Sequence, residues 1–285
     1  METHTIQWGD HRLELGKNTC VMGVLNVTPD SFSDGGKYLS PQDAIAHGER
    51  LIEEGADILD IGGESTRPFS EAVSIEEETH RVVPVIEALA KRVQVPISID
   101  TSKVEVARKA LEAGASIIND ISALRSEPDL ADIAAQYGVP VILMHMKGTP
   151  KTMQISPVYK NLIEEIKSFL EERVLFATSK GIPRSRIIID PGIGFGKTFD
   201  HNFQLIKHLR AFESLNLPIL VGPSRKAFIR KTICKDDLSP EAPQVESGTQ
   251  AAVAAAVLAG AHMVRVHDVA NTRITLKIID AIKNA

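Results

Sequence analysis

Short aliphatic runs recur along the chain, and each is followed by a loop and then by a longer amphipathic segment. Near-continuous apolar runs are typical of strands that are buried on both faces of a parallel sheet. These runs predict strands at residues 20–26, 57–61, 96–100, 116–120, 140–144, 186–190, 218–222 and 263–266.

The amphipathic segments predict helices at residues 41–54, 74–92, 102–113, 128–137, 158–180, 199–215, 224–233, 243–259 and 268–283. Some of them carry boundary signals. Ser74 and Glu77 have the spacing of a capping box, which predicts a helix start. Glycines within residues 53–57 and 112–115 stand where a helix would end before a strand.

The strand-helix units begin about 35 residues apart on average, which matches a (β/α)8 barrel in number and total length. A doubly wound open sheet is the alternative, but the loop after the first strand reads NVTPDSFSDGG instead of GxGxxG. The first residues predict a short hairpin that turns at Gly9-Asp10 and closes the bottom of the barrel. No linker divides the chain, so we expect an α/β fold with one TIM-barrel domain over residues 1–285.

Composition narrows the range of partners. The chain is 43% hydrophobic and 24% charged, and its formal net charge is −5, so an anionic ligand must be drawn by a local basic cluster. The amino terminus has no apolar signal core, and no run approaches the length of a membrane span. Cys20 and Cys234 fit no metal spacing or redox pair. We therefore expect a cytoplasmic protein with reduced cysteines and no nucleic-acid or membrane partner.

The segment DPGIGFGKT, from Asp190 to Thr198, ends like a phosphate-binding loop. That motif needs a glycine five residues before Gly196, so that consecutive backbone N–H groups surround a phosphate. Pro191 occupies this place and has no N–H, and Gly192 comes one residue too late. The spacing therefore argues against a nucleotide site.

In a (β/α)8 barrel the active site lies at the carboxyl ends of the strands. Polar residues converge there in this sequence: Asn26, Glu64, Ser65, Thr66, Arg67, Asp100, Asn119, Asp120, His145, Asp190, Ser224, Arg225, Lys226, Arg265 and His267. Carboxylates at the ends of apolar strands are costly unless they are paired or hydrogen-bonded. Each could cap the following helix, or together they could face a ligand rich in N–H donors, such as a 2-aminopyrimidinone edge.

The basic members of this set could together hold an anionic group such as a diphosphate or a carboxylate, although any one of them could simply form an ion pair.

Two long loops, 26–36 and 62–73, have glycine flanks and could act as lids. Asp30 and Asp34 are candidate outer ligands of Mg²⁺ or ordinary turn residues. Met144 is expected to pack against a ligand ring or the core, and His145 has no assigned role. His262 and His267 face opposite sides of a strand, which argues against a zinc pair.

A set of motif-like segments extends over nearly the whole chain: MGVLNVTPDSFSDGG, DIGGESTRP, ISIDTSK, IINDIS, ILMHM, IIDPGIGFGKT, GPSRKAF and RVHDV. In these segments and in their order the chain strongly resembles the dihydropteroate synthase family, the sulfonamide target of folate biosynthesis. This resemblance implies a (β/α)8 barrel that joins 6-hydroxymethyl-7,8-dihydropterin diphosphate to p-aminobenzoate with Mg²⁺. The products would be 7,8-dihydropteroate and pyrophosphate, and the protein would be a homodimer and a target of sulfonamide inhibitors.

The resemblance also implies roles for single residues. The pterin would be bound by Asp100, Asn119, Met144, Asp190 and Lys226, and the diphosphate by Asn26, Arg265 and His267. The p-aminobenzoate side would consist of Thr66, Arg67, Pro68 and Phe195, and the metal would lie near Asn26, Asp30 and Asp34. Asp100, Asp190, Lys226 and Arg265 would form the catalytic set.

The implied mechanism is similar to an SN1 displacement, in which diphosphate leaves before the amine attacks. Two residues depart from the family pattern: Ala227 stands where some relatives have serine, and Phe69 where glycine is frequent. Two rival functions remain. A folate-corrinoid methyltransferase has a similar barrel but lacks the STRP and SRK patterns that are present here. A non-catalytic pterin-binding paralogue is the other.

Overall fold

The computed structural model describes residues 2–28, 40–65, 70, 72–153, 155–234 and 238–285. Over these residues the main sheet consists of eight parallel strands. They are β3 (Cys20–Asn26), β4 (Ile58–Gly62), β5 (Ile97–Asp100), β6 (Ile117–Asp120), β7 (Val141–Met144), β8 (Ile187–Asp190), β9 (Leu220–Val221) and β10 (Met263–Val266).

The strands follow one another around a ring. Strands β3 to β8 pair in sequence order, and β10 lies between β3 and β9. A parallel bridge between Ile189 and Ile219 links β8 to the short β9, and the Ile189 N–H donates to the carbonyl of Pro218 at 3.0 Å. The ring is thereby nearly closed, and the predicted (β/α)8 barrel is confirmed.

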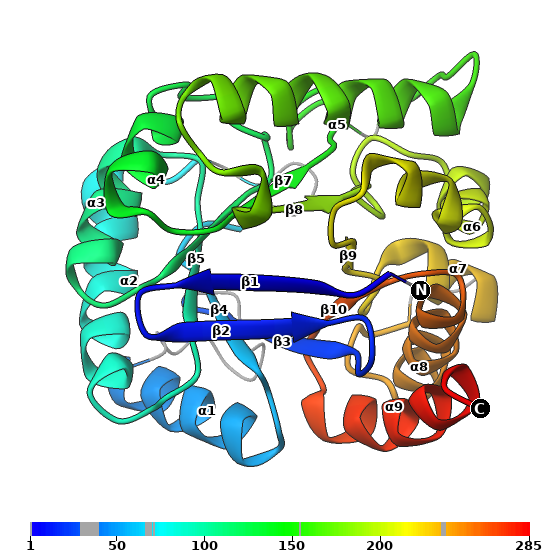
Figure 1. The fold of residues 1–285 in the computed structure, drawn as a ribbon. Coiled ribbons are helices and arrows are strands. Elements are labelled where there is room, and N and C mark those ends of the chain that lie inside the picture. The colour runs from blue at the N-terminus through cyan, green and yellow to red at the C-terminus, as the bar shows by residue number, and fades with distance from the viewer. Residues whose placement is uncertain (1, 29–39, 66–69, 71, 154, 235–237) are drawn as a thin grey trace.

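The helices surround this ring (Figure 1). They are α1 (Pro41–Glu53), α2 (Ile75–Ala90), α3 (Val104–Glu112), α4 (Leu130–Tyr137), α5 (Leu162–Ser179), α6 (Phe199–Lys207), α7 (Ala227–Ile233), α8 (Pro243–Leu258) and α9 (Val269–Lys283). The strand residues that point away from the barrel axis pack against the buried faces of the helices, for example Val82, Val85, Ile86 and Leu89 of α2. Among the described helices, none is long and apolar enough to cross a membrane.

The two largest differences from the predicted helix boundaries concern α5 and α6, and one predicted cap also needs correction. The helix predicted at 158–180 begins at Leu162, because the Asn161 side chain caps it by accepting from the N–H of Glu164. The helix predicted at 199–215 ends at Lys207 and continues as a 3₁₀ segment, Leu209–Leu215. At the start of α2, Ser74 is the N-cap, but the Glu77 carboxylate accepts from Arg81, so only half of the predicted capping box is seen.

A separate two-stranded antiparallel hairpin precedes the barrel, as predicted. Strands β1 (His4–Trp8) and β2 (His11–Leu15) meet at Gly9, which has a φ of +47°. Ile6, Trp8, Leu13 and Leu15 of the hairpin are buried. Arg186, at the start of β8, donates to the Gln7 carbonyl. The hairpin thus covers the amino-terminal end of the barrel, and the carboxyl-terminal end is the one that holds the polar residues.

Candidate active site

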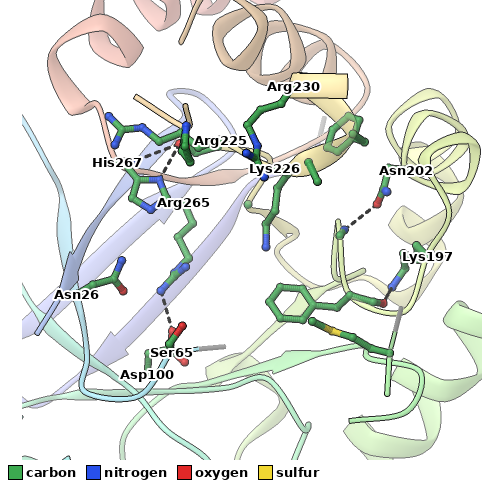
Figure 2. Close-up of a pocket in the computed structure, with 18 of the residues that line it drawn as sticks. Asn26, Ser65, Asp100, Lys197, Asn202, Arg225, Lys226, Arg230, Arg265 and His267 are labelled. Atoms are coloured by element: carbon green, nitrogen blue, oxygen red, sulfur yellow. Dashed lines mark hydrogen bonds and ion pairs between the residues drawn. The ribbon is translucent and has the colours of Figure 1, made fainter. Parts of the chain in front are cut away.

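A cavity of about 650 Å³ opens at the carboxyl ends of the strands (Figure 2). Its walls come from the ends of β3, β4, β5 and β10 and from the loops that follow β8 and β9. The polar residues that line it include Asn26, Glu64, Ser65, Asp100, Lys197, Asn202, Ser224, Arg225, Lys226, Arg265 and His267. Residues that are far apart in the sequence therefore meet in one pocket, as the strand-end pattern predicted.

Arg265 forms the centre of an ion-pair network. Its Nε donates to Asp60 Oδ2 at 2.5 Å, and its terminal NH2 donates to Asp100 Oδ2 at 2.7 Å, an interaction drawn in Figure 2. The amide of Asn119 donates to the same Asp60 oxygen at 3.1 Å. Burial disfavours the charged guanidinium, but the carboxylates of Asp60 and Asp100 outweigh this effect and raise the pKa of Arg265 above its ordinary value.

Asp60 is absent from the set predicted from the sequence, although it is completely buried at the base of this network. It lies inside the run DILDI, two residues before the end of β4, so it does not belong to the polar residues at the strand ends. A usable signal was present. A carboxylate inside an apolar strand is costly unless it has a partner, so the position of Asp60 in the sequence already indicates one member of a buried ion pair.

Asp100, Asp190 and Lys226 have strongly shifted pKa values. Burial raises the pKa of Asp100 to about 7, and the neighbouring Asp60 adds to the rise while Arg265 opposes it. Burial likewise raises the pKa of Asp190 to about 6, against the opposing hydrogen bond from the Gly192 N–H. Burial, together with Arg265, lowers the pKa of Lys226 to about 8. A polar ligand in this pocket can therefore compensate groups that burial leaves poorly solvated.

The loop DPGIGFGKT packs tightly beneath the pocket. Gly192, Gly194 and Gly196 have φ values of +73°, +86° and +66°. A Cβ at Gly192 would lie only 1.9 Å from the carbonyl oxygen of His145. The glycines thus allow a tight turn that a side chain at Gly192 would block.

Lys197 of this loop is also absent from the predicted set. It is 1% exposed, and its Nζ contacts His145 Nδ1 and the Phe195 carbonyl oxygen, both at 2.9 Å. Burial lowers the pKa of Lys197 far below its ordinary value. Burial, and next the Lys197 charge, lower the pKa of His145 to about 2, so the imidazole is neutral and can accept. Through these buried contacts, Lys197 stabilises the conformation of the loop.

An aromatic and apolar corner adjoins the charged part of the site. Phe195 packs with Met144, Met146 and Met153 in a small buried cluster. The Lys226 ammonium lies 4.0 Å from the centroid of the Phe195 ring, a cation-π contact. Lys226 thus stands between the carboxylates on one side and the apolar corner on the other.

The basic corner contains His267, whose Nδ1 lies 2.9 Å from Ser224 Oγ. Arg225 lies within ion-pair distance of Glu241 and Glu246, at 4.0 and 3.8 Å. These two carboxylates compensate part of its positive charge. His262 lies at the other end of the barrel, where its Nδ1 accepts from the Ile219 N–H. The two histidines thus flank β10 at its opposite ends, whereas the sequence pattern predicted that the faces of the strand separate them.

The remaining predicted residues fall into three groups. Asp100, Lys226, Arg265, His267, Asn26 and Phe195 line the cavity, whereas Asn119, Asp190 and Met144 are buried and do not line it. Asp120 caps the turn after β6 by accepting from the N–H groups of Ser122 and Leu124. It does not cap the following helix, as one alternative had it, because α4 begins only at Leu130. Thr66, Arg67, Pro68, Phe69, Asp30 and Asp34 lie outside the described residues.

The comparisons with known proteins agree on one family. Residues 22–267 match the family model described as pterin binding enzyme. Dihydropteroate synthase of Escherichia coli K12 is 47% identical over 265 residues, which are 93% of this chain and 92% of that protein. The chain belongs to the dihydropteroate synthase family.

Solved structures of dihydropteroate synthases have the same fold as this chain. The Yersinia pestis enzyme with a sulfonamide drug complex is 43% identical and matches with a TM-score of 0.91 over 98% of this chain and 99% of that one. The Xanthomonas albilineans enzyme with 4-aminobenzoic acid is 45% identical and matches with a TM-score of 0.90 over the full length of both chains. Family membership makes the chain a pterin-binding transferase, as the sequence motifs implied.

Proposed function

We propose that the chain joins 6-hydroxymethyl-7,8-dihydropterin diphosphate to p-aminobenzoate and releases 7,8-dihydropteroate and pyrophosphate. The observation that carries this proposal is the division of one pocket into three parts. Carboxylates surround Arg265, a histidine and an asparagine stand on the side of β3 and β10, and an aromatic corner lies beyond Lys226. These parts correspond to the ring, the diphosphate and the arylamine of the two substrates.

We assign the pterin to the acidic part. Asp100 and Lys226 line this part of the pocket and would bind a 2-aminopyrimidinone ring as acceptor and donor. Asn119 and Asp190 are buried and do not line the cavity, so they would contact the ring only if it reached deeper than the cavity wall. The raised pKa values of Asp100 and Asp190 support this assignment, because a ligand that donates hydrogen bonds would compensate carboxylates that burial leaves poorly solvated. Asp60, through Arg265 and Asn119, would keep these groups in place.

We assign the diphosphate to Asn26, Arg265 and His267. Donors that are already oriented toward a leaving group stabilise the negative charge that develops as its bond breaks. Arg265 is suited to this role because the Asp60 contact fixes its guanidinium. The same contact raises its pKa, so it stays charged.

The family resemblance implies Mg²⁺, and the described donors fit it in a limited way. Among the described residues no group of three or more His, Cys, Asp or Glu side chains could hold a metal. Mg²⁺ often uses only one or two protein oxygens together with substrate phosphates and water, and the Asn26 carbonyl oxygen could supply one. The ion would neutralise leaving-group charge when bound.

We assign p-aminobenzoate to the corner of Phe195, where the aromatic ring and the three methionines offer an apolar surface. Thr66, Arg67 and Pro68 join this side by their place in the sequence motif. The Xanthomonas enzyme binds 4-aminobenzoic acid and the Yersinia enzyme a sulfonamide drug, and we propose that this chain binds both classes. Ala227 lines the pocket without a hydroxyl, so its contribution to this side is purely apolar.

The residues support departure of the diphosphate before attack by the amine. Arg265 and His267 would hold the leaving group, while the carboxylates of Asp100 and Asp190 would favour positive charge on the pterin. No protein nucleophile is required, since the arylamine itself attacks the methylene carbon. The protein's task is then to orient both substrates and to exclude water.

The proposal is tested by supplying the purified protein with the pterin diphosphate, p-aminobenzoate and Mg²⁺ and separating the products by chromatography. We expect dihydropteroate, and we expect it to disappear when Mg²⁺ is chelated. A folded protein that binds the pterin but forms no dihydropteroate would instead be the non-catalytic paralogue. Cytoplasmic location remains a prediction from the sequence.

A further inference from the structure

One residue of the pocket wall has a strained backbone. Arg225 has a φ of +58°, in the left-handed region that crowds the Cβ of an ordinary residue against the following carbonyl oxygen. It stands between Ser224 and Lys226, and all three residues line the cavity. Such a conformation persists only where the surrounding structure holds it, so the contacts of Arg225 show what fixes this part of the site.

The contacts of Arg225 lead to helix α8. Its backbone N–H donates to Thr249 Oγ1 at 3.1 Å, and Thr249 is completely buried. Its side chain extends to the same helix, where Nε lies 3.8 Å from Glu246 Oε2. Glu246 and Thr249 are three residues apart, so they share one face of α8. The backbone and the side chain of Arg225 are therefore both held by this helix.

Close packing brings α8 to the turn at Arg225. A Cβ at Gly248 would lie 2.6 Å from Ile229 Cγ2 and 2.7 Å from Ile233 Cδ1. Both isoleucines belong to α7, the helix that follows the turn. The absence of a side chain at Gly248 thus lets α8 approach α7, and it brings the hydroxyl of the next residue, Thr249, within reach of the turn.

The turn at Arg225 places two groups of the site. On one side, Ser224 Oγ lies 2.9 Å from His267 Nδ1 and accepts from the His267 N–H at 3.3 Å. On the other side, Lys226 Nζ lies 4.0 Å from the centroid of the Phe195 ring. Figure 2 shows Arg225, Lys226 and His267 together along one wall of the pocket. A change in the backbone of Arg225 would therefore displace both groups.

We propose that Thr249 is a positioning residue for the proposed reaction: its hydroxyl holds the turn at Arg225 in the left-handed conformation and so sets the position of Lys226 in the pocket. Thr249 does not line the cavity, so it acts through the turn. The effect on the reaction rests on the proposed function, whereas the held turn itself can be tested without substrate.

Two substitutions at position 249 separate the hydroxyl from the methyl group. Thr249→Val keeps the size of the side chain but removes the acceptor, whereas Thr249→Ser keeps the acceptor but removes a buried methyl group. We expect kcat/KM for the pterin diphosphate to fall roughly tenfold or more in Thr249→Val, because small displacements of positioning groups have effects of this size. In Thr249→Ser it should stay within about twofold of the wild type, although the lost methyl group lowers the thermal midpoint. If Thr249 only filled space, activity would instead follow stability in both variants.

Hydrogen exchange, measured by mass spectrometry on the peptide that contains Arg225, reports on the turn directly. The Arg225 N–H should exchange faster in Thr249→Val, because it loses its partner, and should stay protected in Thr249→Ser. Thr249→Cys is the further variant in case Thr249→Val does not fold. Because a thiol is only a weak acceptor, its kcat/KM should fall roughly threefold.

Val253→Ala is the matched control. Val253 lies one turn further along α8 and is as buried as Thr249. Its truncation should lower the thermal midpoint by creating a cavity, but it should leave kcat/KM and the exchange of the Arg225 N–H unchanged.

An unchanged kcat/KM in folded Thr249→Val would overturn the proposal, and so would an equal loss of activity in Thr249→Ser or unchanged exchange of the Arg225 N–H in Thr249→Val. The wild-type protein is measured in the same assay. If it forms no dihydropteroate, the proposed function itself is wrong. This result is distinct from a failure of the positioning role, in which the wild type is active and Thr249→Val is equally active.

Discussion

At the scale of single residues, the pKa of Asp190 predicts how the free energy of unfolding depends on pH. Burial raises this pKa to about 6, above the value of an unfolded chain, so the folded state binds the proton more tightly. The resulting penalty is fully present above the folded pKa and is lost as the pH falls below the unfolded one. Asp190→Asn should therefore raise the free energy of unfolding by about 1–3 kcal/mol at pH 8 and change it little near pH 4.

The same variant should lose pterin affinity, because an amide cannot replace an ionised acceptor. Asparagine still has an oxygen that can accept from the Gly192 N–H, so the loop should be retained. Urea unfolding at the two pH values and calorimetry with the pterin provide the measurements. A variant that is less stable than the wild type at pH 8 would show that the carboxylate is needed for the fold.

Single residues also show what a sequence without a structure can reveal. The positions of Asp100, Lys226 and Arg265 on the cavity wall were predictable because each stands where a strand or its loop meets the open end of the barrel. Asp60 and Lys197 are harder to predict, since their role depends on which distant side chain reaches them. Such partners are set by tertiary packing and leave no local pattern.

At the scale of elements, the loop after β8 depends on glycine for two separate reasons. Gly192 has a positive φ, and a side chain there would also collide with the His145 carbonyl oxygen. Gly181 has a positive φ of +92°, but its nearest neighbour would lie at an ordinary 3.8 Å. A side chain at Gly181 would therefore cause backbone strain alone, whereas a side chain at Gly192 would cause strain and a collision.

Gly181→Ala should cost about 1–2 kcal/mol of unfolding free energy, which is the strain of the left-handed conformation alone. Gly192→Ala should cost clearly more, and it should weaken binding of the arylamine because Phe195 lies three residues further along. Urea unfolding of both variants and binding of a sulfonamide to each provide the comparison. Equal losses of stability would mean that the His145 carbonyl moves freely out of the way.

The elements themselves follow closely from the sequence pattern, with informative exceptions. Apolar runs fix the strands because a parallel barrel strand is buried on both faces. The end of α6 at Lys207 was not predictable, since the residues up to Leu215 keep their apolar pattern while the backbone tightens to a 3₁₀ form. The late start of α5 depends on the cap formed by Asn161, a signal that the sequence does contain.

At the scale of the whole molecule, the barrel and the hairpin were predictable from the number and spacing of the units. We also propose that residues 1–285 form a single domain, as the absence of a linker in the sequence suggests. Contacts that join the two ends of the chain support this: the Asp280 carboxylate accepts from both the N–H and the hydroxyl of Thr19, at 2.9 and 2.8 Å.

The surface of α9 leads to the last prediction. Ile274, Ile278 and Ile282 are spaced by four residues, so they share one face of the helix, and they are 57–62% exposed. Leu258 of the neighbouring α8 is exposed as well. We propose this surface as the interface of the homodimer that the family resemblance implies, because contiguous exposed apolar residues mark protein interaction sites.

Ile278→Lys should convert the proposed dimer to a monomer, since it places a charge in the middle of this face, and sedimentation equilibrium of both proteins measures the change. Leu175→Lys is the matched control: Leu175 is equally exposed, at 62%, but it lies on α5, away from α9 (Figure 1). It should leave the association unchanged. Because the catalytic pocket lies within one chain, monomeric Ile278→Lys should still form dihydropteroate, whereas loss of activity together with dimerisation would show that the interface supports the site.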